Sequence, residues 1–261
     1  MKRFGLAILG LIFLVGVAAP WIAPGDPFAM ASEPLRPPGA GHLFGTDDLG
    51  RDVYSGVIHG TRTSLYVGAG AAAIAGALGL LIGGLAAIRG GLVDHFLMRS
   101  TDFVQALPRF LLIVTVVSLF GHNFNLIVLT IGLTEWPTTA RLFRAQAMTT
   151  LTRDFSVAAR AAGAGHLAIL RRHVLPLSLA VMAAQISYQA GGAILVESGL
   201  SLLGLGDPAV MSWGTLLGAA QRFVRDAWWI SLFPGLAITL TILGCSLVAD
   251  GLGATKTGGL S

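Results

Sequence analysis

Six long apolar segments alternate with polar segments along the chain. They cover residues 4–23, 63–88, 101–121, 125–145, 177–200 and 228–250. An α-helix of about twenty apolar residues spans the hydrocarbon core of a bilayer, whereas the strands of a membrane barrel alternate apolar and polar positions. The continuous runs therefore predict an all-α integral membrane protein with about six transmembrane helices.

The third segment is the weakest of the six. Its clean apolar run covers only residues 110–120, which is too short for about 30 Å of hydrocarbon. A full span must therefore include Asp102, Pro108 and Arg109. A re-entrant segment is the alternative, and we expect Arg109 to extend toward the inner interface.

The first segment has the position of a secretory signal peptide, but its apolar run is longer than a normal signal core. Pro20 also directly follows Ala18 and Ala19, where cleavage would occur. We therefore expect an uncleaved helix. The proline-rich residues 24–62 are predicted to form an external loop, which divides the chain into residues 1–62 and a core membrane domain, residues 63–261.

The composition excludes a water-soluble protein, because 54% of the residues are hydrophobic and 11% are charged, against about 25% charged in soluble domains. The chain also contains 35 glycines. Among them, Gly76, Gly79 and Gly83 give the second span a face that is smooth enough for close helix contact. The single cysteine, Cys245, excludes an internal disulfide and a cysteine-cluster metal site.

Lysine and arginine are distributed unevenly between the two predicted sides of the membrane. Of the 17 residues, twelve are expected on the inner side: Lys2, Arg3, Arg89, Arg99, Arg109, Arg141, Arg144, Arg153, Arg160, Arg171, Arg172 and Lys256. This asymmetry follows the positive-inside rule and places both termini in the cytoplasm. Membrane orientation thus accounts for the net charge of +4, and we expect no nucleic-acid partner.

The inner loop between the fourth and fifth spans, residues 153–176, has its own pattern. Asp154 is predicted to be the N-cap of a short helix, and Gly163 to end it as a C′ glycine. One face of that helix carries Phe155, Ala158, Ala159 and Ala162.

A second amphipathic piece of this loop carries Leu167, Leu170 and Val174 on one side, and Pro176 marks the turn into the fifth span. The loop could lie on anionic lipid. Alanines contact lipid poorly but fit a shallow protein groove, so we favour a docking element for a cytoplasmic partner.

Five blocks of the sequence resemble the permeases of ABC importers for dipeptides, oligopeptides and nickel. The inner loop is similar to their cytoplasmic EAA loop in Ala-Ala-Arg-Ala at 158–161, Gly163, and His-Val-Leu-Pro at 173–176. The other blocks are HLFGTDDLGRDVYS at 42–55 with GTRTSL at 60–65, GGLVD at 90–94, ESGLSLLGLG at 197–206 and FPGLA at 233–237. They occur in order over most of the chain.

This resemblance implies the type I importer permease fold and a bacterial inner-membrane location. It also implies a homologous second permease, two cytoplasmic ATPase subunits and a periplasmic solute-binding protein as partners. ATP and Mg²⁺ would belong to the ATPases, so this chain would have no cofactor of its own. The residues implied for ATPase coupling are Phe155, Ala158, Ala159, Arg160, Gly163, His173 and Pro176. The implied cargo is di- or oligopeptides, with nickel or a metal chelate as the alternative.

The sequence departs from the family pattern at two positions. Val157 occupies a place where the family commonly has Glu, which removes one salt bridge to the ATPase. Glu135 occupies a place where relatives often have a small polar residue. It could line the translocation path and favour amine-bearing cargo, or pair with Arg141 or Arg144 near the inner interface. Glu197 fits the family and could be a helix contact or line the path.

Other function classes are less consistent with the sequence. The chain has no Walker A loop, which an ATPase needs. An intramembrane serine protease would need a serine and a histidine on facing spans, but all six histidines lie in predicted loops or at span ends. An ATP-independent carrier or channel would have no use for the inner docking loop. We therefore expect a non-catalytic transporter subunit.

Overall fold

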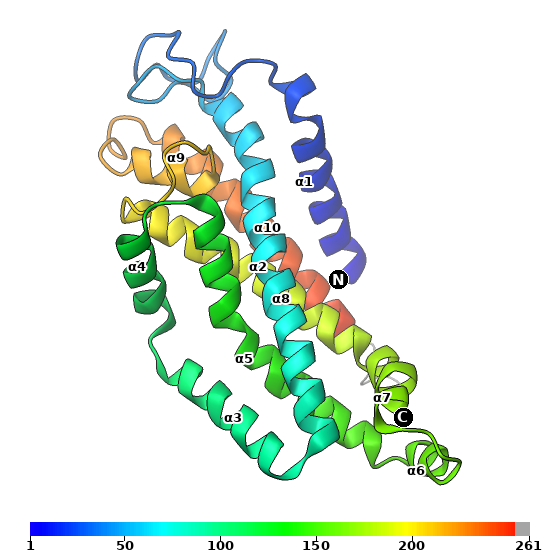
Figure 1. The fold of residues 1–261 in the computed structure, drawn as a ribbon. Coiled ribbons are helices and arrows are strands. Elements are labelled where there is room, and N and C mark those ends of the chain that lie inside the picture. The colour runs from blue at the N-terminus through cyan, green and yellow to red at the C-terminus, as the bar shows by residue number, and fades with distance from the viewer. Residues whose placement is uncertain (254–261) are drawn as a thin grey trace.

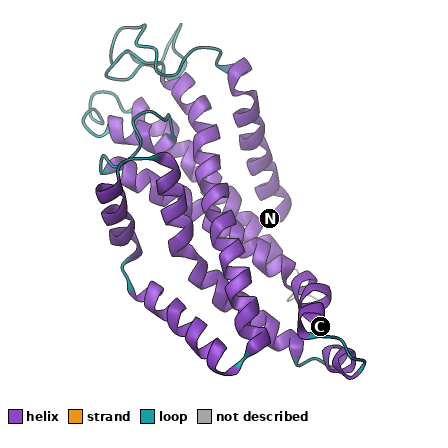
Figure 2. Cartoon of the chain, in the orientation of Figure 1, coloured by secondary structure: helices purple, strands orange, loops and turns teal. Residues whose placement is uncertain are grey.

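The computed structural model describes residues 1–253, and their regular secondary structure is entirely helical (Figures 1 and 2). This confirms the all-α fold class. Lys256, expected on the inner side, lies outside the described residues. The helices are α1 (Lys2–Ile22), α2 (Val53–Arg89), α3 (Gly91–Ala106), α4 (Arg109–Phe120), α5 (Phe124–Leu151), α6 (Asp154–Ala161), α7 (His166–Ile169), the π-helical turn η1 (Leu170–Val174), α8 (Leu175–Leu202), α9 (Trp213–Ala220) and α10 (Trp229–Gly253).

Within residues 1–253, four helical stretches are long and apolar enough to cross a membrane: α1, α2, α10 and the continuous stretch His166–Leu202. The bent pair α3 and α4 makes a fifth if it is counted as one span. Helix α5 has 28 residues and packs along α2, but it is more polar than the others. The helix count is therefore roughly consistent with the six predicted spans.

Helix α2 begins at Val53, ten residues before the predicted start of the second span. Asp52 caps it, because its side chain accepts a hydrogen bond of 2.8 Å from the Ser55 N–H. The polar residues just before position 63 indicate a loop by composition, but they lie inside the helix, where Gly60 packs against Trp213. The predicted division at residues 62 and 63 thus falls within one continuous helix.

The predicted third span is not one continuous helix, because the chain breaks at Leu107 and Pro108. Helices α3 and α4 meet there at 77°. Proline has no N–H and disfavours helical dihedrals for the residue before it, and Leu107 accordingly has extended dihedrals of φ −76° and ψ 134°. The break places Arg109 at the first position of α4.

Two of the three glycines predicted to make a close helix contact, Gly79 and Gly83, pack against α5, whereas Gly76 faces Ile186 of α8. A Cβ atom added at Gly79 would lie 2.4 Å from the Thr139 Cβ, and one at Gly83 would lie 2.3 Å from the Ala140 carbonyl oxygen. Neither position leaves room for a side chain. The absence of side chains lets the two backbones approach closely, and this is the most extensive helix contact in the fold.

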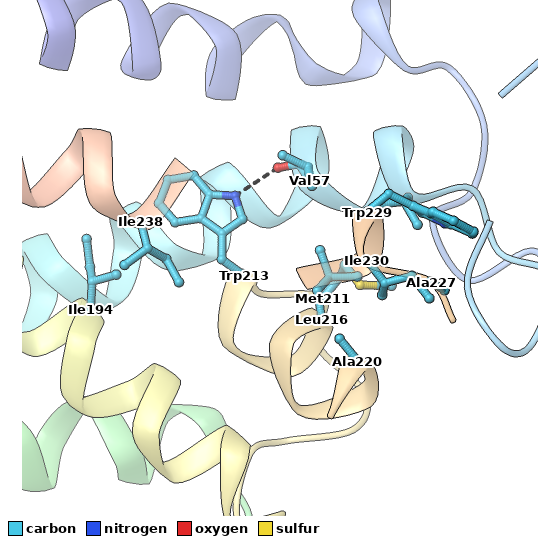
Figure 3. Packing of buried hydrophobic residues seen from close by; sticks show 11 residues of the cluster. Val57, Ile194, Met211, Trp213, Leu216, Ala220, Ala227, Trp229, Ile230 and Ile238 are labelled. Carbon is cyan, nitrogen blue, oxygen red and sulfur yellow. Dashed lines mark hydrogen bonds between the residues drawn. The ribbon is translucent and has the colours of Figure 1, made fainter. Parts of the chain in front are cut away.

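A cluster of buried apolar side chains closes the end of the molecule that carries the loop of residues 24–52 and α9 (Figure 3). Two tryptophans anchor it. The Trp213 indole donates a hydrogen bond of 3.0 Å to the Val57 carbonyl of α2 (Figure 3), and the Trp229 indole donates one of 3.1 Å to the Thr46 carbonyl. Helix α9 is therefore fixed to α2, and the outer loop is fixed to α10.

Candidate coupling loop and translocation cavity

The inner loop forms a compact knob at the end of the molecule opposite the loop of residues 24–52 (Figure 1). It consists of α6, α7 and η1, and it connects α5 to α8. Gly163 has a φ of +88°, which glycine adopts without strain, and it follows the C-cap Ala162. This confirms Gly163 as the C′ residue of the first helix.

Two details of the predicted loop are wrong. Asp154 is the first residue of α6, and the N-cap is Arg153, whose side chain makes no capping hydrogen bond. Pro176 does not mark a turn, because it lies in the first turn of α8 and the chain runs through η1 into α8 as one helical stretch. The missing N–H of proline is tolerated in a first helical turn.

Two hydrogen bonds attach the knob to the last turn of α5. The Ser156 hydroxyl donates to the Thr150 carbonyl at 2.8 Å, and the Arg160 guanidinium donates to the Leu151 carbonyl at 3.0 Å. Both acceptors belong to a helix end, where carbonyls lack intrahelical partners. Ser156 is fully buried. This role of Ser156 could not be predicted, since no spacing in the sequence marks a serine that bonds backward across a turn.

An aromatic contact joins the two halves of the knob. The Phe155 ring and the His173 ring lie 5.5 Å apart, centroid to centroid, so α6 is linked to η1. Ala158 and Val157 remain exposed, Ala159 is half-buried, and Phe155 keeps 40% of its surface exposed. The knob therefore presents small and apolar side chains outward while its polar groups hold it to α5.

The second piece of the loop does not bury one common face. Val174 is fully buried and Leu170 is half-buried, but Leu167 is 62% exposed. The π-helical turn η1 explains the difference, because its wider turn shifts the register between Leu167 and Val174.

A cavity of about 310 Å³ lies between α5, α8, α10 and the start of α4. Glu135 lines it and is 4% exposed. Its Oε1 atom accepts a hydrogen bond of 2.9 Å from the Arg109 Nη1 atom. Its Oε2 atom is buried and has no hydrogen-bond partner among residues 1–253.

The predicted partners of Glu135 are wrong. Arg141 pairs with Asp102, and Arg144 pairs with Asp94, so both arginines hold α3 against α5. Arg109 does not extend to the inner interface, because it contacts Glu135. The sequence did contain a signal for these two ion pairs. Residues 91–106 carry two aspartates, and α5 carries two arginines of complementary charge.

Gln189 supports the position of Glu135. Its side-chain Nε2 atom donates to the Glu135 main-chain carbonyl at 3.0 Å, and its Oε1 atom accepts from the Thr139 hydroxyl at 3.1 Å. Gln189 is buried and lines the same cavity. Helices α5 and α8 are thus linked by hydrogen bonds directly beside Glu135.

Glu197 lies elsewhere, at the contact between α8 and α9. Its Oε1 atom accepts hydrogen bonds from the Ser201 hydroxyl at 3.0 Å and the Ser212 hydroxyl at 2.7 Å. It is 2% exposed and is not among the residues that line the cavity around Glu135. This geometry is that of a helix contact.

Comparison with known proteins identifies the family. The model of the binding-protein-dependent transport system inner membrane component family matches residues 79–254, about two thirds of the chain. The chain belongs to this family. The matched region contains α3 to α10, and therefore both the knob and the cavity around Glu135.

Relatives match almost the whole chain. A permease protein of Brucella suis, named for a peptide transport system, is 39% identical over 96% of this chain and 85% of its own length. The di/tripeptide transport system permease protein DppC of Pseudomonas aeruginosa is 39% identical over 95% of this chain and 84% of its own. The dipeptide transport system permease protein DppC of Alkalihalophilus pseudofirmus is 35% identical over 97% and 85%.

Membership of the binding-protein-dependent permease family sets the function class. The chain is a multi-pass membrane protein and a permease subunit of an ABC importer. Members of this family work with ATPase subunits and with a solute-binding protein. An ATP-independent carrier or channel is therefore not favoured.

Proposed function

We propose that this chain forms half of the translocation path for di- or oligopeptides across the inner membrane, driven by separate ATPase subunits. A homologous second permease would complete the path. The knob of residues 153–176 carries the proposal, because it is compact, basic and fixed to a membrane helix. The chain itself is non-catalytic and holds no cofactor, and ATP and Mg²⁺ are bound by the ATPase partners.

The peptide cargo is supported by the names of the relatives and by the charges at the cavity. Arg109 lies within 2.9 Å of Glu135, and a guanidinium repels a free divalent cation at this range. Among the described residues, no group of three or more His, Cys, Asp or Glu side chains could hold a metal ion. Nickel is therefore the less favoured cargo.

The positions of the chain ends and the knob support a proposed orientation in the membrane. A Cβ atom at Gly251 would lie 2.4 Å from the Lys2 Cβ, so the amino-terminal end of α1 lies beside the carboxyl-terminal end of α10. The excess of lysine and arginine on this side supports a cytoplasmic location for both termini. The loop of residues 24–52 then faces the periplasm, where the binding protein delivers cargo.

Coupling would run from the ATPase through the knob into α5. Exposed Phe155, Ala158 and Ala159 are proposed to sit in an ATPase groove. Arg160 bonds the knob to α5, while Gly163 shapes it. His173 and Pro176 connect it to α8. Movement of the knob would be passed directly to the helix that carries Glu135, which biases the path between its inward-open and outward-open states.

Two substitutions test this coupling in the complete importer reconstituted in liposomes. Arg160→Glu removes the donor to the Leu151 carbonyl, a bond to a charged group worth about 1.5–3 kcal/mol. Gly163→Pro imposes a φ near −65° where the native value is +88°. We expect both variants to insert normally, to hydrolyse ATP, and to lose at least about tenfold in uptake per ATP.

The matched control is Arg171→Glu, which makes the same charge reversal in the same loop at an exposed arginine. It should retain much more uptake than Arg160→Glu. Equal losses would mean that only the overall charge of the loop matters, as on a lipid surface. Normal uptake in both Arg160→Glu and Gly163→Pro would refute the coupling role.

A further inference from the structure

The cavity around Glu135 combines two opposite charges at mid-depth in the membrane. Glu135 is eleven residues from the outer end of α5, or about 16 Å along the helix axis, which is about half the thickness of a hydrocarbon core. Arg109 starts α4 directly after the helix break. Non-helical backbone at membrane depth is tolerated where it lines a protein cavity or contacts protein.

The ion pair leaves hydrogen-bonding capacity unused on both Arg109 and Glu135. They share one hydrogen bond, between the Arg109 Nη1 and Glu135 Oε1 atoms. A guanidinium has five N–H donors, and the Arg109 side chain is 48% exposed. The Glu135 Oε2 atom is buried without a partner among residues 1–253, a state that costs free energy unless a donor satisfies it.

We propose that this cavity is a binding subsite for both charged ends of a small zwitterionic peptide, with the ammonium on the Glu135 carboxylate, whose buried Oε2 atom must turn toward the cavity to meet it, and the carboxylate on the free donors of Arg109. The inference rests on the proposed peptide importer and adds a cargo-binding site within this subunit. The peptide adds to the existing ion pair without breaking it. The positive end of the α4 dipole lies at Arg109 and further favours the carboxylate.

The remaining walls fit such a ligand. A volume of about 310 Å³ is at the lower end of the roughly 300–1,000 Å³ found for small-molecule sites, so the subsite suits a dipeptide and not a long chain. Gln185 and Tyr188 bring an amide and a phenol for the peptide bond, while Leu195 and Ile242 bring apolar surface for side chains. Recognition of the ends alone leaves the side chains free to vary.

The charge pattern disfavours the other ligands of similar size. A free metal cation would meet a guanidinium beside the single carboxylate, and a phosphate would meet the carboxylate beside the single guanidinium. In both cases a like charge lies within hydrogen-bond distance of the attractive one, which costs binding free energy. A zwitterion is the ligand that satisfies both groups.

The test measures equilibrium binding of radiolabelled dialanine to the assembled importer in lipid nanodiscs without its binding protein. Unlabelled N-acetyl-dialanine lacks the ammonium, and dialanine amide lacks the carboxylate. Both should compete at least about tenfold more weakly than dialanine in the wild-type complex. Glu135→Gln should weaken dialanine binding by about 10- to 100-fold, the effect of one charge-assisted hydrogen bond.

Each variant should lose discrimination against one blocked peptide only. Glu135→Gln should no longer discriminate against N-acetyl-dialanine, and Arg109→Gln should no longer discriminate against dialanine amide. A purely structural role would weaken all three peptides equally. Glu135→Asp, which keeps the charge, should recover part of the affinity if Glu135→Gln assembles poorly. Asp102→Asn is the control, since it removes an ion pair between α3 and α5 that lies outside the cavity.

Three results would overturn the subsite: undetectable dialanine binding to the wild-type complex at millimolar concentration, equal competition by the blocked peptides, or unchanged binding in Glu135→Gln. Uptake by the full importer with its binding protein separates this failure from that of the proposed function. If ATP-dependent peptide uptake persists, only the subsite is wrong. If the wild-type importer takes up no peptide, the proposed function fails.

Discussion

Glu135 and Glu197 are both buried glutamates in the membrane domain, but their surroundings differ. Each leaves its Oε2 atom without a hydrogen-bond partner among residues 1–253. Glu197 lies in a closed contact in which two serine hydroxyls bond to Oε1 and Gly214 packs against Oε2. Glu135 faces a cavity and an arginine that is half exposed. Burial alone therefore does not distinguish a structural acid from one that is free to bind a ligand, whereas open space beside the carboxylate does.

The largest expected effect on stability is that of Glu197→Ala. It leaves the Ser201 and Ser212 hydroxyls without their acceptor and opens a void, at a cost of about 3 kcal/mol. Glu135→Ala should cost about 1 kcal/mol, because the half-exposed Arg109 can turn into the existing cavity. Thermal unfolding of the assembled importer in one detergent compares the two variants. Equal shifts in Tm would remove the distinction between the two glutamates.

A smaller effect is expected from adding one methyl group beside each glutamate. A Cβ atom at Gly214 would lie 2.7 Å from Glu197 Oε2 and 2.8 Å from the Ser198 Cα, whereas one at Gly192 would meet nothing nearer than Glu135 Oε1 at 3.9 Å. Gly214→Ala should therefore cost about 2 kcal/mol through overpacking, and Gly192→Ala should be neutral or slightly stabilising. The same unfolding assay measures both, and a neutral Gly214→Ala would show that the contact is loose.

The smallest effect concerns a third buried carboxyl, outside the bilayer. Burial raises the pKa of Asp47 above its ordinary value of 3.8, and this outweighs the hydrogen bonds from the Arg51 and Leu49 N–H groups, which lower it. A carboxyl with a raised pKa in the folded state contributes stability at low pH and loses it as the pH rises through that pKa.

The wild-type importer should accordingly lose a small part of its stability between pH 4 and neutral pH through Asp47. Asp47→Asn keeps an acceptor for both N–H groups and should remove that part of the slope. The measurement is the difference in Tm between pH 4 and pH 7 for the variant and the wild type. An identical pH dependence in both proteins would contradict the assignment.

The apolar pattern predicted most of the membrane helices because a span needs only length and hydropathy. It could not fix the ends of α2, since residues just outside the bilayer are polar whether they are helical or not, and Asp52 caps a helix that composition alone does not show. The glycines at positions 79 and 83 predicted a close contact, because a helix face without side chains lets a second backbone approach closely.

The sequence could not predict which residues form ion pairs, for a different reason. Which of three arginines meets Glu135 depends on the rotation of α5 and on the 77° bend at Pro108. Both are set by packing among segments that are far apart in the chain. Gly163 could be assigned because a C′ glycine depends only on its neighbours, whereas the contacts of Ser156 and Arg160 depend on how the knob folds back onto α5.

The attachment of the knob to the end of α5 makes that helix a lever. Glu135 lies sixteen residues from Leu151, or about 24 Å along the axis. If the helix pivots near its inner end by about 10°, Glu135 is displaced by about 4 Å at this radius, which is more than the length of a hydrogen bond. A small movement of the knob, driven by the ATPase subunits, would thus displace Glu135 far enough to decide whether a cargo is held or released.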